Sequence, residues 1–359
     1  MELAFELSGE HETLPKSEVF ACLHALSISY AEKIFSEGIL VVDMQLSHEA
    51  LDTLSRRLGM THCIYEVKGM SKPEEREILA VVKNADMGNI MEQGHTFAVR
   101  VKVKSNFISE ERKPLSLGRS LERKAGEIIK RKGYKVNLTN PSKTFVLLLT
   151  NQTCFFCLLL HATDKKQFEG RKPHLRPFFS PGVIQPKIAR ALVNLSGIKE
   201  RELFLDPFCG TGGILIEAGL IGATLVGIDV QEKMVRGAEE NLKAYGLTGD
   251  LIIGDASKIA LQDNSVDAVV TDMPYGRSSL ISGSGYFFAE SRALFLEGLY
   301  QNTLNEVHRV LRTRGKAVIV SNSSSFYSLS HEYNFRILEN HKYRVHKSLS
   351  RYIAVLERE

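Results

Sequence analysis

Asp272-Met273-Pro274-Tyr275 brings together groups that could hold a planar amino group for chemistry. A carboxylate and a main-chain carbonyl can each accept one proton of an exocyclic NH2, and an aromatic ring can stack on the heterocycle that carries it. The mostly apolar run 266–270 just before it predicts a buried parallel strand. The tetrapeptide would then lie at a strand's carboxyl end, where open α/β sheets bind ligands. A simple turn formed by Pro274, with Asp272 as its cap, is the alternative interpretation.

A glycine-rich turn precedes this tetrapeptide in the chain, at Cys209-Gly210-Thr211-Gly212-Gly213. Glycines at such a turn let the backbone approach a ligand above the N-terminus of a helix. The turn does not match the dinucleotide fingerprint, because Leu215 stands where the third glycine should be. It also follows an acid, Asp206, which would face a pyrophosphate badly but could bind the ammonium group of a methionine moiety.

Two more acids follow predicted strands. Asp229 is placed to accept hydrogen bonds from both ribose hydroxyls, and Asp255 from the amino group of adenine. Each acid alone could be a helix cap, but the three acids and the glycine turn together predict S-adenosylmethionine as cofactor. The predicted cofactor contacts are Phe179, Ser180, Asp206, Cys209, Gly210, Thr211, Gly212, Gly213, Asp229, Val230, Asp255, Ala256 and Asp272.

Alternating strand and helix patterns position these residues from Glu202 onward, which predicts a doubly wound parallel sheet. The last two strands, at Phe335–His346 and Tyr352–Leu356, have no helix between them and predict an antiparallel hairpin at the end of a seven-stranded sheet. The other predicted strands are Leu203–Leu205, Thr224–Ile228, Leu251–Ile253, Val266–Thr271 and Ala317–Val320, and the helices are Ile214–Leu220, Glu232–Tyr245 and Phe295–Leu311.

A basic block lies between this half and the N-terminal residues. From Ala98 to Arg176 there are 18 Lys and Arg against 6 Asp and Glu, a net +12, whereas the rest of the chain has a net −8. The pattern at Leu117–Lys132 predicts a helix with Leu121, Ala125 and Ile128 on its apolar face. Such a block is typical of a module that binds a polyanion, although a merely solubilising surface is the alternative. The predicted RNA contacts are Arg119, Arg123, Lys130, Arg171, Lys172 and Arg176.

The five cysteines are odd in number and scattered, which favours a reducing cytoplasm over a disulfide framework. No signal peptide and no long apolar segment is expected, so the prediction includes no membrane association. Cys154 and Cys157 have the spacing of a metal-binding pair, but a strand pattern would point their thiols to opposite faces. No metal site is therefore predicted.

The basic block resembles a THUMP domain, an RNA-binding module of tRNA-modifying enzymes. The resemblance is carried by Phe97-Ala98-Val99-Arg100-Val101, by the basic helix with Gly126, and by Val136-Asn137-Leu138-Thr139-Asn140-Pro141. Residues 181–359 resemble a class I methyltransferase with a Rossmann-like fold. Class I enzymes that methylate planar amino groups carry Asn/Asp-Pro-Pro-Tyr/Phe at this strand end, and here Met273 replaces the first proline.

Together with Arg176-Pro177-Phe178-Phe179-Ser180-Pro181-Gly182, these motifs resemble the archaeal tRNA (guanine-10, N2)-methyltransferases. The resemblance implies N2-methylation, often dimethylation, of a tRNA guanosine, and a small zinc-binding activator protein is a partner of some relatives. Asp272, Met273, Pro274 and Tyr275 would be the catalytic residues. A tRNA guanosine-6 enzyme, a DNA amino-methyltransferase and a non-catalytic tRNA-binding protein are the alternatives.

Four segments are expected in the chain. Residues 1–83 read as an α+β ferredoxin-like support domain, 84–163 as the THUMP-like domain, 164–180 as a linker and 181–359 as the methyltransferase domain. The overall expectation is an α/β protein in which two N-terminal domains precede the Rossmann-like one.

Overall fold

The computed structural model describes residues 1–104, 114–164, 166–275, 289–323, 333–346 and 349–359. These residues form two compact units, and the chain passes between them several times. The first unit consists of Met1–Gly9, Ile28–Ser55 and Thr61–Thr163, and the second of Glu10–Ser27, Arg56–Met60 and Asp164–Glu359.

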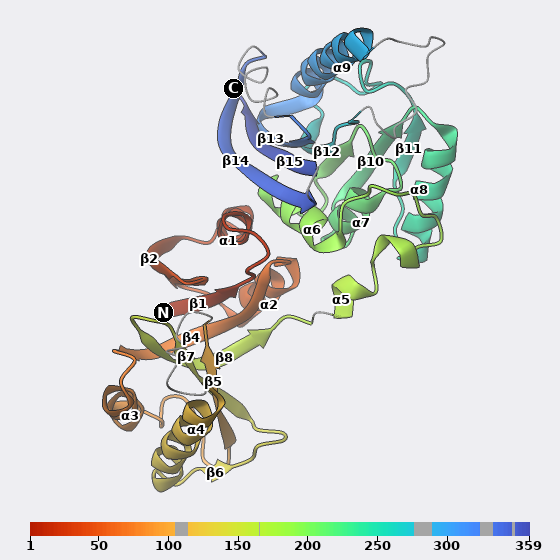
Figure 1. Ribbon diagram of the computed structural model, residues 1–359. Helices are drawn as coiled ribbons and strands as arrows, with labels where there is room; N and C mark the ends of the chain where they lie inside the picture. The colour runs from red at the N-terminus through yellow and green to blue at the C-terminus, as the bar shows by residue number, and fades with distance from the viewer. Residues whose placement is uncertain (105–113, 165, 276–288, 324–332, 347–348) are drawn as a thin grey trace. The chain divides into compact units, whose positions relative to one another are not determined.

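The first unit is built on one eight-stranded sheet with the order β2-β3-β1-β4-β8-β7-β5-β6 (Figure 1). Its strands are β1 (Glu2–Leu7), β2 (Tyr30–Ser36), β3 (Ile39–Met44), β4 (Thr61–Ser71), β5 (Thr96–Val103), β6 (Lys135–Val136), β7 (Lys143–Leu149) and β8 (Cys154–Ala162). The antiparallel order β2-β3-β1-β4 is that of the predicted ferredoxin-like fold, which is confirmed. Sequence analysis missed β2, an edge strand whose largely exposed residues show no clear alternation.

The predicted boundary at residue 83 does not divide the first unit. Strand β4 pairs with β8 from Cys63 opposite Ala162 to Ser71 opposite Cys154. This pairing satisfies backbone groups that each strand would otherwise expose at an edge. The ferredoxin-like and THUMP-like segments therefore share one sheet.

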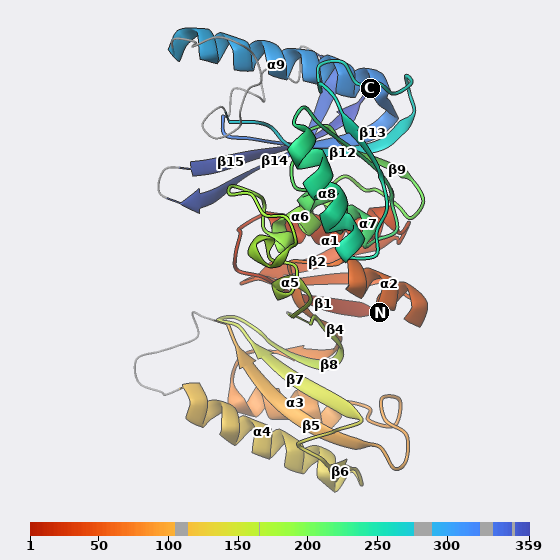
Figure 2. The same ribbon diagram turned by 90° about the vertical axis from the view of Figure 1, so that its right-hand side faces the viewer.

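Helices α3 (Glu75–Asn84) and α4 (Pro114–Arg131) pack with β5, β7 and β8 around one core of the first unit (Figure 2). On α4 the buried residues are Leu121, Ala125 and Ile129, so the apolar face is turned slightly from the predicted one. Cys154 belongs to this core, whereas Cys157 belongs to the core on the sheet's other face. Their thiols diverge as the strand pattern predicts.

The second unit is built on a seven-stranded sheet with the order β11-β10-β9-β12-β13-β15-β14. The first five strands are parallel, and β15 and β14 form the predicted antiparallel hairpin. The strands are β9 (Leu203–Asp206), β10 (Thr224–Asp229), β11 (Asp250–Ile253), β12 (Val266–Asp272), β13 (Leu311–Ser321), β14 (Phe335–His346) and β15 (Leu349–Arg358). The doubly wound sheet expected from the sequence is confirmed.

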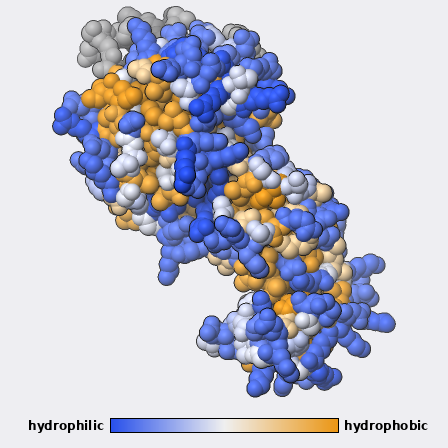
Figure 3. All heavy atoms as spheres, turned by 180° about the vertical axis from the view of Figure 1, so that it is seen from behind, coloured by the Kyte–Doolittle hydropathy of each residue, from blue (hydrophilic) through white to orange (hydrophobic). Residues whose placement is uncertain are grey.

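Two cores cover the two faces of this sheet. Helices α6 (Pro186–Leu195), α7 (Gly213–Gly219) and α8 (Glu232–Ala244) contribute to one core. Helix α9 (Ala289–Val310) is the only helix that contributes to the other among the residues described. Figure 3 shows hydrophobic residues gathered over part of the rear of this unit, bordered by hydrophilic ones.

Helix α1 (Leu14–Ala25), expected within the N-terminal support domain, is part of the second unit, where Leu14 and Ala21 enter the core beside α6. Its Glu18 carboxylate is buried and accepts hydrogen bonds from the backbone nitrogens of Gly59 and Met60 and from Asn194 Nδ2, at 2.7–2.9 Å. These bonds satisfy a charge that burial would otherwise destabilise. The segment 1–83 therefore contributes to both compact units.

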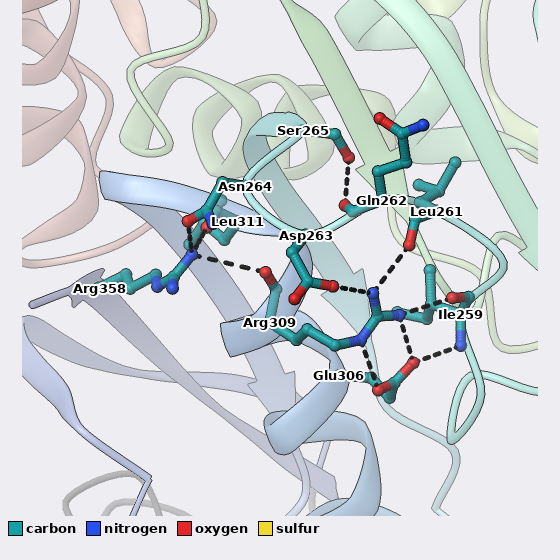
Figure 4. A network of polar contacts seen from close by, with 10 residues as sticks. All are labelled: Ile259, Leu261, Gln262, Asp263, Asn264, Ser265, Glu306, Arg309, Leu311 and Arg358. Carbon is teal, nitrogen blue, oxygen red and sulfur yellow. Dashed lines mark hydrogen bonds and ion pairs between the residues drawn. The ribbon is translucent and has the colours of Figure 1, made fainter.

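A network around Arg309 holds the connection between β11 and β12, which contains no helix (Figure 4). The guanidinium donates to the carbonyl oxygens of Ile259 at 2.7 Å and Leu261 at 2.8 Å, and it pairs with Glu306 and Asp263. Glu306 in turn accepts the backbone N–H of Ile259 at 2.7 Å. The loop that follows β11 is thereby tied to α9.

The described residues contain neither a membrane-spanning helix nor a cluster of metal-binding side chains. None of their helices is both long and apolar enough to cross a membrane. They also contain no group of three or more His, Cys, Asp and Glu side chains arranged to hold a metal ion.

Candidate active site

Four acidic residues follow four adjacent strands at the same edge of the second sheet. Asp206, Asp229 and Asp272 are the last residues of β9, β10 and β12, and Asp255 comes two residues after β11. Because these strands are neighbours in the order β11-β10-β9-β12, their carboxyl ends form one line. The parallel sheet thus brings together acids that are up to 66 residues apart in the sequence.

Asp206 is the most buried of these acids, with 1% of its surface exposed. Its Oδ1 accepts hydrogen bonds from Thr271 Oγ1 at 2.7 Å and from the backbone nitrogen of Phe208 at 3.2 Å. Burial raises the pKa of Asp206 to about 7, and the nearby charges of Asp272 and Asp229 also raise it. The group therefore titrates near neutrality, far above an ordinary aspartate.

The glycine turn between β9 and α7 uses conformations that favour glycine. Gly210 has φ +50° and Gly212 has φ +74°, both in the left-handed region. A Cβ on Gly212 would also lie 3.2 Å from that of Ala238 on α8. The Gly210 nitrogen donates to Asp229 Oδ2 at 3.1 Å, which fixes the turn against the end of β10.

Asp229 is held by the backbone at both oxygens, because the Gln231 nitrogen donates to Oδ1 at 2.9 Å. Burial raises its pKa. Asp255 is exposed, and its Oδ1 accepts the backbone N–H of Ser257 at 2.8 Å. Ala256 beside it is buried. Each carboxylate oxygen has a second lone pair with which it can still accept a ligand's proton.

Large apolar side chains are unusually exposed around this line of acids. Phe179 is 51% exposed, Val230 50% and Ile253 56%. Val230 and Ile253 flank the carboxyl ends of β10 and β11, and Phe179 lies in the predicted segment ahead of α6. Such residues at a strand-end site provide apolar contact for a flat heterocycle.

The segment Arg176–Gly182, here called the strap, is joined to the glycine turn by one buried amide. Asn241 on α8 accepts the Phe178 N–H and donates to the Phe178 carbonyl and to the Thr211 carbonyl, each at 2.9 Å. The Phe178 ring lies over Gly237, where a Cβ would come within 2.0 Å of it. Asn241 and Gly237 therefore set the position of the strap that carries Phe179 and Ser180.

The target motif Asp272–Tyr275 is held by an arginine from β15. Arg351 Nη2 donates to Asp272 Oδ2 at 3.0 Å and to the carbonyl of Gly182 at 2.8 Å, while its Nε donates to Tyr275 Oη at 3.0 Å. The Tyr275 hydroxyl donates to Asp272 Oδ1. About one-fifth of the Asp272 side chain is exposed, and burial raises its pKa while Arg351 acts in the opposite direction.

Met273, the departure from the usual motif, has its side chain in the core beneath the sheet, and its nitrogen donates to the Val320 carbonyl at 2.9 Å. An apolar side chain is what this buried position requires, so methionine can replace proline there. The Pro274 carbonyl accepts a hydrogen bond from Tyr300 Oη on α9 at 2.8 Å. The chain that directly follows Tyr275, from residue 276 to 288, lies outside the described residues.

The predicted RNA contacts fall into two groups. Arg119, Arg123 and Lys130 are exposed on α4, as expected, and Lys172 is partly exposed and paired with Glu169. Arg171 and Arg176 are instead buried, which does not support their prediction as RNA contacts.

Internal partners hold both buried arginines. Arg171 forms two hydrogen bonds to Glu217 on α7, at 2.8 and 3.1 Å, and Arg176 Nε donates to the Arg171 carbonyl at 3.1 Å. The end of the basic block is therefore part of the second unit.

Sequence reasoning missed Arg351, Asn241 and Tyr300. Arg351 lies 79 residues beyond Asp272, and Asn241 lies inside an amphipathic helix where a buried amide breaks the pattern. That break at Asn241 was the one available signal. No spacing rule connects the other two to the motif.

Comparisons with known proteins agree with this geometry. Residues 173–353 match a family model described as an RMKL-like methyltransferase domain. A tRNA (guanine(10)-N2)-dimethyltransferase of Methanothermobacter thermautotrophicus is 37% identical over the full length of both chains. A protein of the same name from Methanocaldococcus jannaschii is 32% identical, covering 83% of this chain and 95% of that protein.

Among solved structures, TrmN from Thermus thermophilus matches with a TM-score of 0.55 and 18% identity, covering all of both chains, which supports the fold. The methyltransferase expectation is thereby confirmed at the level of the family. The chain belongs to the tRNA (guanine(10)-N2)-dimethyltransferase family, whose class I methyltransferase domain it carries in its second unit.

Proposed function

We propose that this chain transfers methyl groups from S-adenosylmethionine to N2 of a guanosine in tRNA, at position 10, adding one or two. The carrying observation is the arrangement of Asp272, Tyr275 and Arg351 at the end of a line of strand-end acids. Relatives that match the whole or most of the chain are named for this reaction.

The residues present fit S-adenosylmethionine. Half-exposed Val230 and Ile253 adjoin the carboxyl ends of β10 and β11, half-exposed Phe179 lies on the strap, and the turn before α7 contains two left-handed glycines. In the proposed arrangement Asp206 serves the ammonium group, Asp229 the ribose hydroxyls and Asp255 the adenine amino group. Phe179, Val230 and Ala256 provide apolar contact, and the bound cofactor supplies an electrophilic sulfonium methyl group.

The chemistry of the target motif follows from the poor nucleophilicity of guanine N2, whose lone pair is delocalised into the ring. Hydrogen bonds from its two protons to Asp272 and to the Met273 carbonyl would localise that lone pair and aim it. The N2 lone pair would form the new N–C bond, and the bound cofactor would supply the methyl group and keep the electrons of the bond to sulfur. Asp272 then accepts the proton released from N2, and Tyr275 stacks on the base.

The base must leave its stack to reach Asp272, because only about one-fifth of that side chain is exposed at the sheet edge. The exposed cations of α4, Arg119, Arg123 and Lys130, are proposed to bind the tRNA backbone. Their charge gives affinity without sequence selectivity.

The test is methyl transfer from labelled cofactor to tRNA transcripts, followed by mapping of the labelled nucleotide. Asp272→Asn removes the proton acceptor and should lower kcat by about 100-fold or more. Asp250→Asn, at the opposite end of β11, is the matched control and should retain wild-type activity. Label at guanosine 6, on DNA, or on no nucleic acid would overturn the assignment, and so would full activity of Asp272→Asn.

Two further proposals concern the surroundings of the enzyme. A cytoplasmic location is consistent with five cysteines that are all free and buried. A small zinc-binding activator protein is proposed as a partner on the ground of the family resemblance. Full activity of the purified chain alone would remove that requirement.

A further inference from the structure

Arg351 is a buried cation at the candidate site, and no sequence motif of the chain predicts its place there. It is 5% exposed and lies on β15, opposite Tyr343 of β14. Burying a guanidinium destabilises a fold unless its donors are paired, and Arg351 has polar partners at the candidate site. These partners are Asp272, Tyr275 and the carbonyl of Gly182.

The contacts distinguish the two oxygens of Asp272. Oδ2 is held by Arg351 Nη2, and Oδ1 accepts the Tyr275 hydroxyl. A substrate amino group can reach Oδ1 by replacing the tyrosine hydroxyl, which also frees the ring of Tyr275 to turn toward the base. Oδ2 stays paired throughout, because its partner belongs to the sheet.

We propose that Arg351 is a positioning residue for methyl transfer, which orients the Asp272 carboxylate and keeps it ionised so that Oδ1 receives the substrate amino group. This inference rests on the proposed function. It assigns a role to the terminal hairpin, whose residues no sequence motif connects with the reaction.

The electrostatics of the site support this role. Burial raises the pKa of Asp272, and the charge and hydrogen bond of Arg351 lower it. Among the residues that the structure describes, the other titratable groups that face the carboxylate are Tyr275, Asp206 on β9 and Tyr300 on α9. None of these is a cation, so Arg351 supplies the positive charge that favours the ionised form.

The same nitrogen connects the target motif with the strap. Nη2 donates both to Asp272 Oδ2 and to the Gly182 carbonyl, three residues after Phe179. Loss of Arg351 therefore affects Asp272 directly and the strap at one point only. Asn241 still holds the strap at Phe178.

The experiment measures kcat for tRNA methylation between pH 5.5 and 9 in the wild type, Arg351→Gln and Arg351→Lys. In Arg351→Gln the acid limb should shift upward by about one pH unit, because the proton acceptor loses its cation. At pH 7 kcat should fall by roughly 10- to 100-fold and recover partly at pH 9. Arg351→Lys keeps the charge and should restore the position of the limb, though not full kcat, since lysine lacks the planar fork.

The matched control is Arg336→Gln on β14, which removes an exposed arginine paired with Glu357 from the same hairpin. Its profile should equal that of the wild type. A uniform loss of kcat in Arg351→Gln with an unshifted limb, or wild-type activity, would overturn the inference. Cofactor affinity, measured with S-adenosylhomocysteine by calorimetry, should change by less than about threefold in each variant. Activity of the wild type tests the proposed function separately.

Discussion

At the scale of single residues, Asp206 stands out because its environment suits a ligand better than the free protein. Its carboxyl group is almost completely buried, and both hydrogen bonds that it accepts fall on the same oxygen. The raised pKa means that ionisation is unfavourable in the folded chain. A binding site for a cationic group often carries such a cost to stability.

Replacing Asp206 by Asn should therefore stabilise the free protein at high pH. Between about pH 4 and pH 7 the folded chain keeps a proton that the unfolded chain has lost, so the free energy of unfolding falls as pH rises. Asn cannot ionise, and its Oδ1 can still accept from Thr271 and Phe208. At pH 8 we expect the free energy of unfolding of the variant to exceed that of the wild type by on the order of 1–3 kcal/mol, with a correspondingly higher melting temperature. Near pH 4 the two proteins should be equally stable.

Calorimetry with S-adenosylhomocysteine should show weaker binding to the same variant, by about tenfold, because the ammonium partner has lost its charge. Equal stabilisation at pH 4 and pH 8 would contradict the raised pKa. Unchanged affinity would remove Asp206 from the proposed cofactor contacts.

At the scale of elements, α8 does more than cover the sheet. Its Asn241 joins the strap to the glycine turn, and its Gly237 leaves space for the Phe178 ring. The helix therefore positions two backbone segments that approach the same site from different parts of the chain. This is how a segment ahead of the domain can contribute to a site at the sheet edge.

Gly237→Ala should reverse the usual effect of such a change. Alanine ordinarily stabilises a helix by up to about 1 kcal/mol relative to glycine. Here the new Cβ would overlap Phe178, so the strap must move, and KM for the cofactor should rise by roughly tenfold or more. Gly126→Ala on α4, where a Cβ meets nothing within 4 Å, is the control and should leave KM unchanged. An unchanged KM in Gly237→Ala would contradict the role given to the strap.

At the scale of the whole molecule, the basic residues fall into two groups, one exposed to solvent and one paired with buried acidic side chains. Arg119, Arg123 and Lys130 on α4 are exposed, whereas Arg171 is paired with Glu217, which is fully buried and also contacts Arg190 at 2.9 Å. The sequence shows only that both groups are positively charged, and their burial in the folded protein shows that they have different roles. One group is available to a polyanion, and the other stabilises the second unit.

Neutralising the exposed group should weaken tRNA binding, whereas neutralising the buried group should destabilise the fold. Changing Arg119, Arg123 and Lys130 to Gln should lower tRNA affinity and reduce the slope of log K against log salt by up to about 2–3, with the melting temperature unchanged. Arg171→Gln should instead lower stability by about 3 kcal/mol, because Glu217 loses a partner in the interior, and leave the salt slope unchanged. Filter binding at several salt concentrations and thermal melts check both. If Arg171→Gln lowered the salt slope and left the melting temperature unchanged, Arg171 would be an RNA contact after all.

The sequence by itself determined the features that depend on neighbouring residues. Strand and helix periodicity predicts the doubly wound sheet of the second unit and its final hairpin. The acids at strand ends and the glycines after β9 predict the candidate site, because parallel strands necessarily align their carboxyl ends. The α+β character of the N-terminal segment is likewise predicted from local patterns, but β2 and the sheet shared with the THUMP-like segment are not.

Tertiary structure decided what depends on distant pairs. Four such features join residues that are far apart in the chain. They are the contact of Arg351 with Asp272, the burial of Arg171 against Glu217, the entry of α1 into the second unit and the pairing of β4 with β8. The sequence pattern around a polar residue does not indicate which distant residue it will contact. Whether that residue is exposed or buried is decided only when the helices and strands pack together.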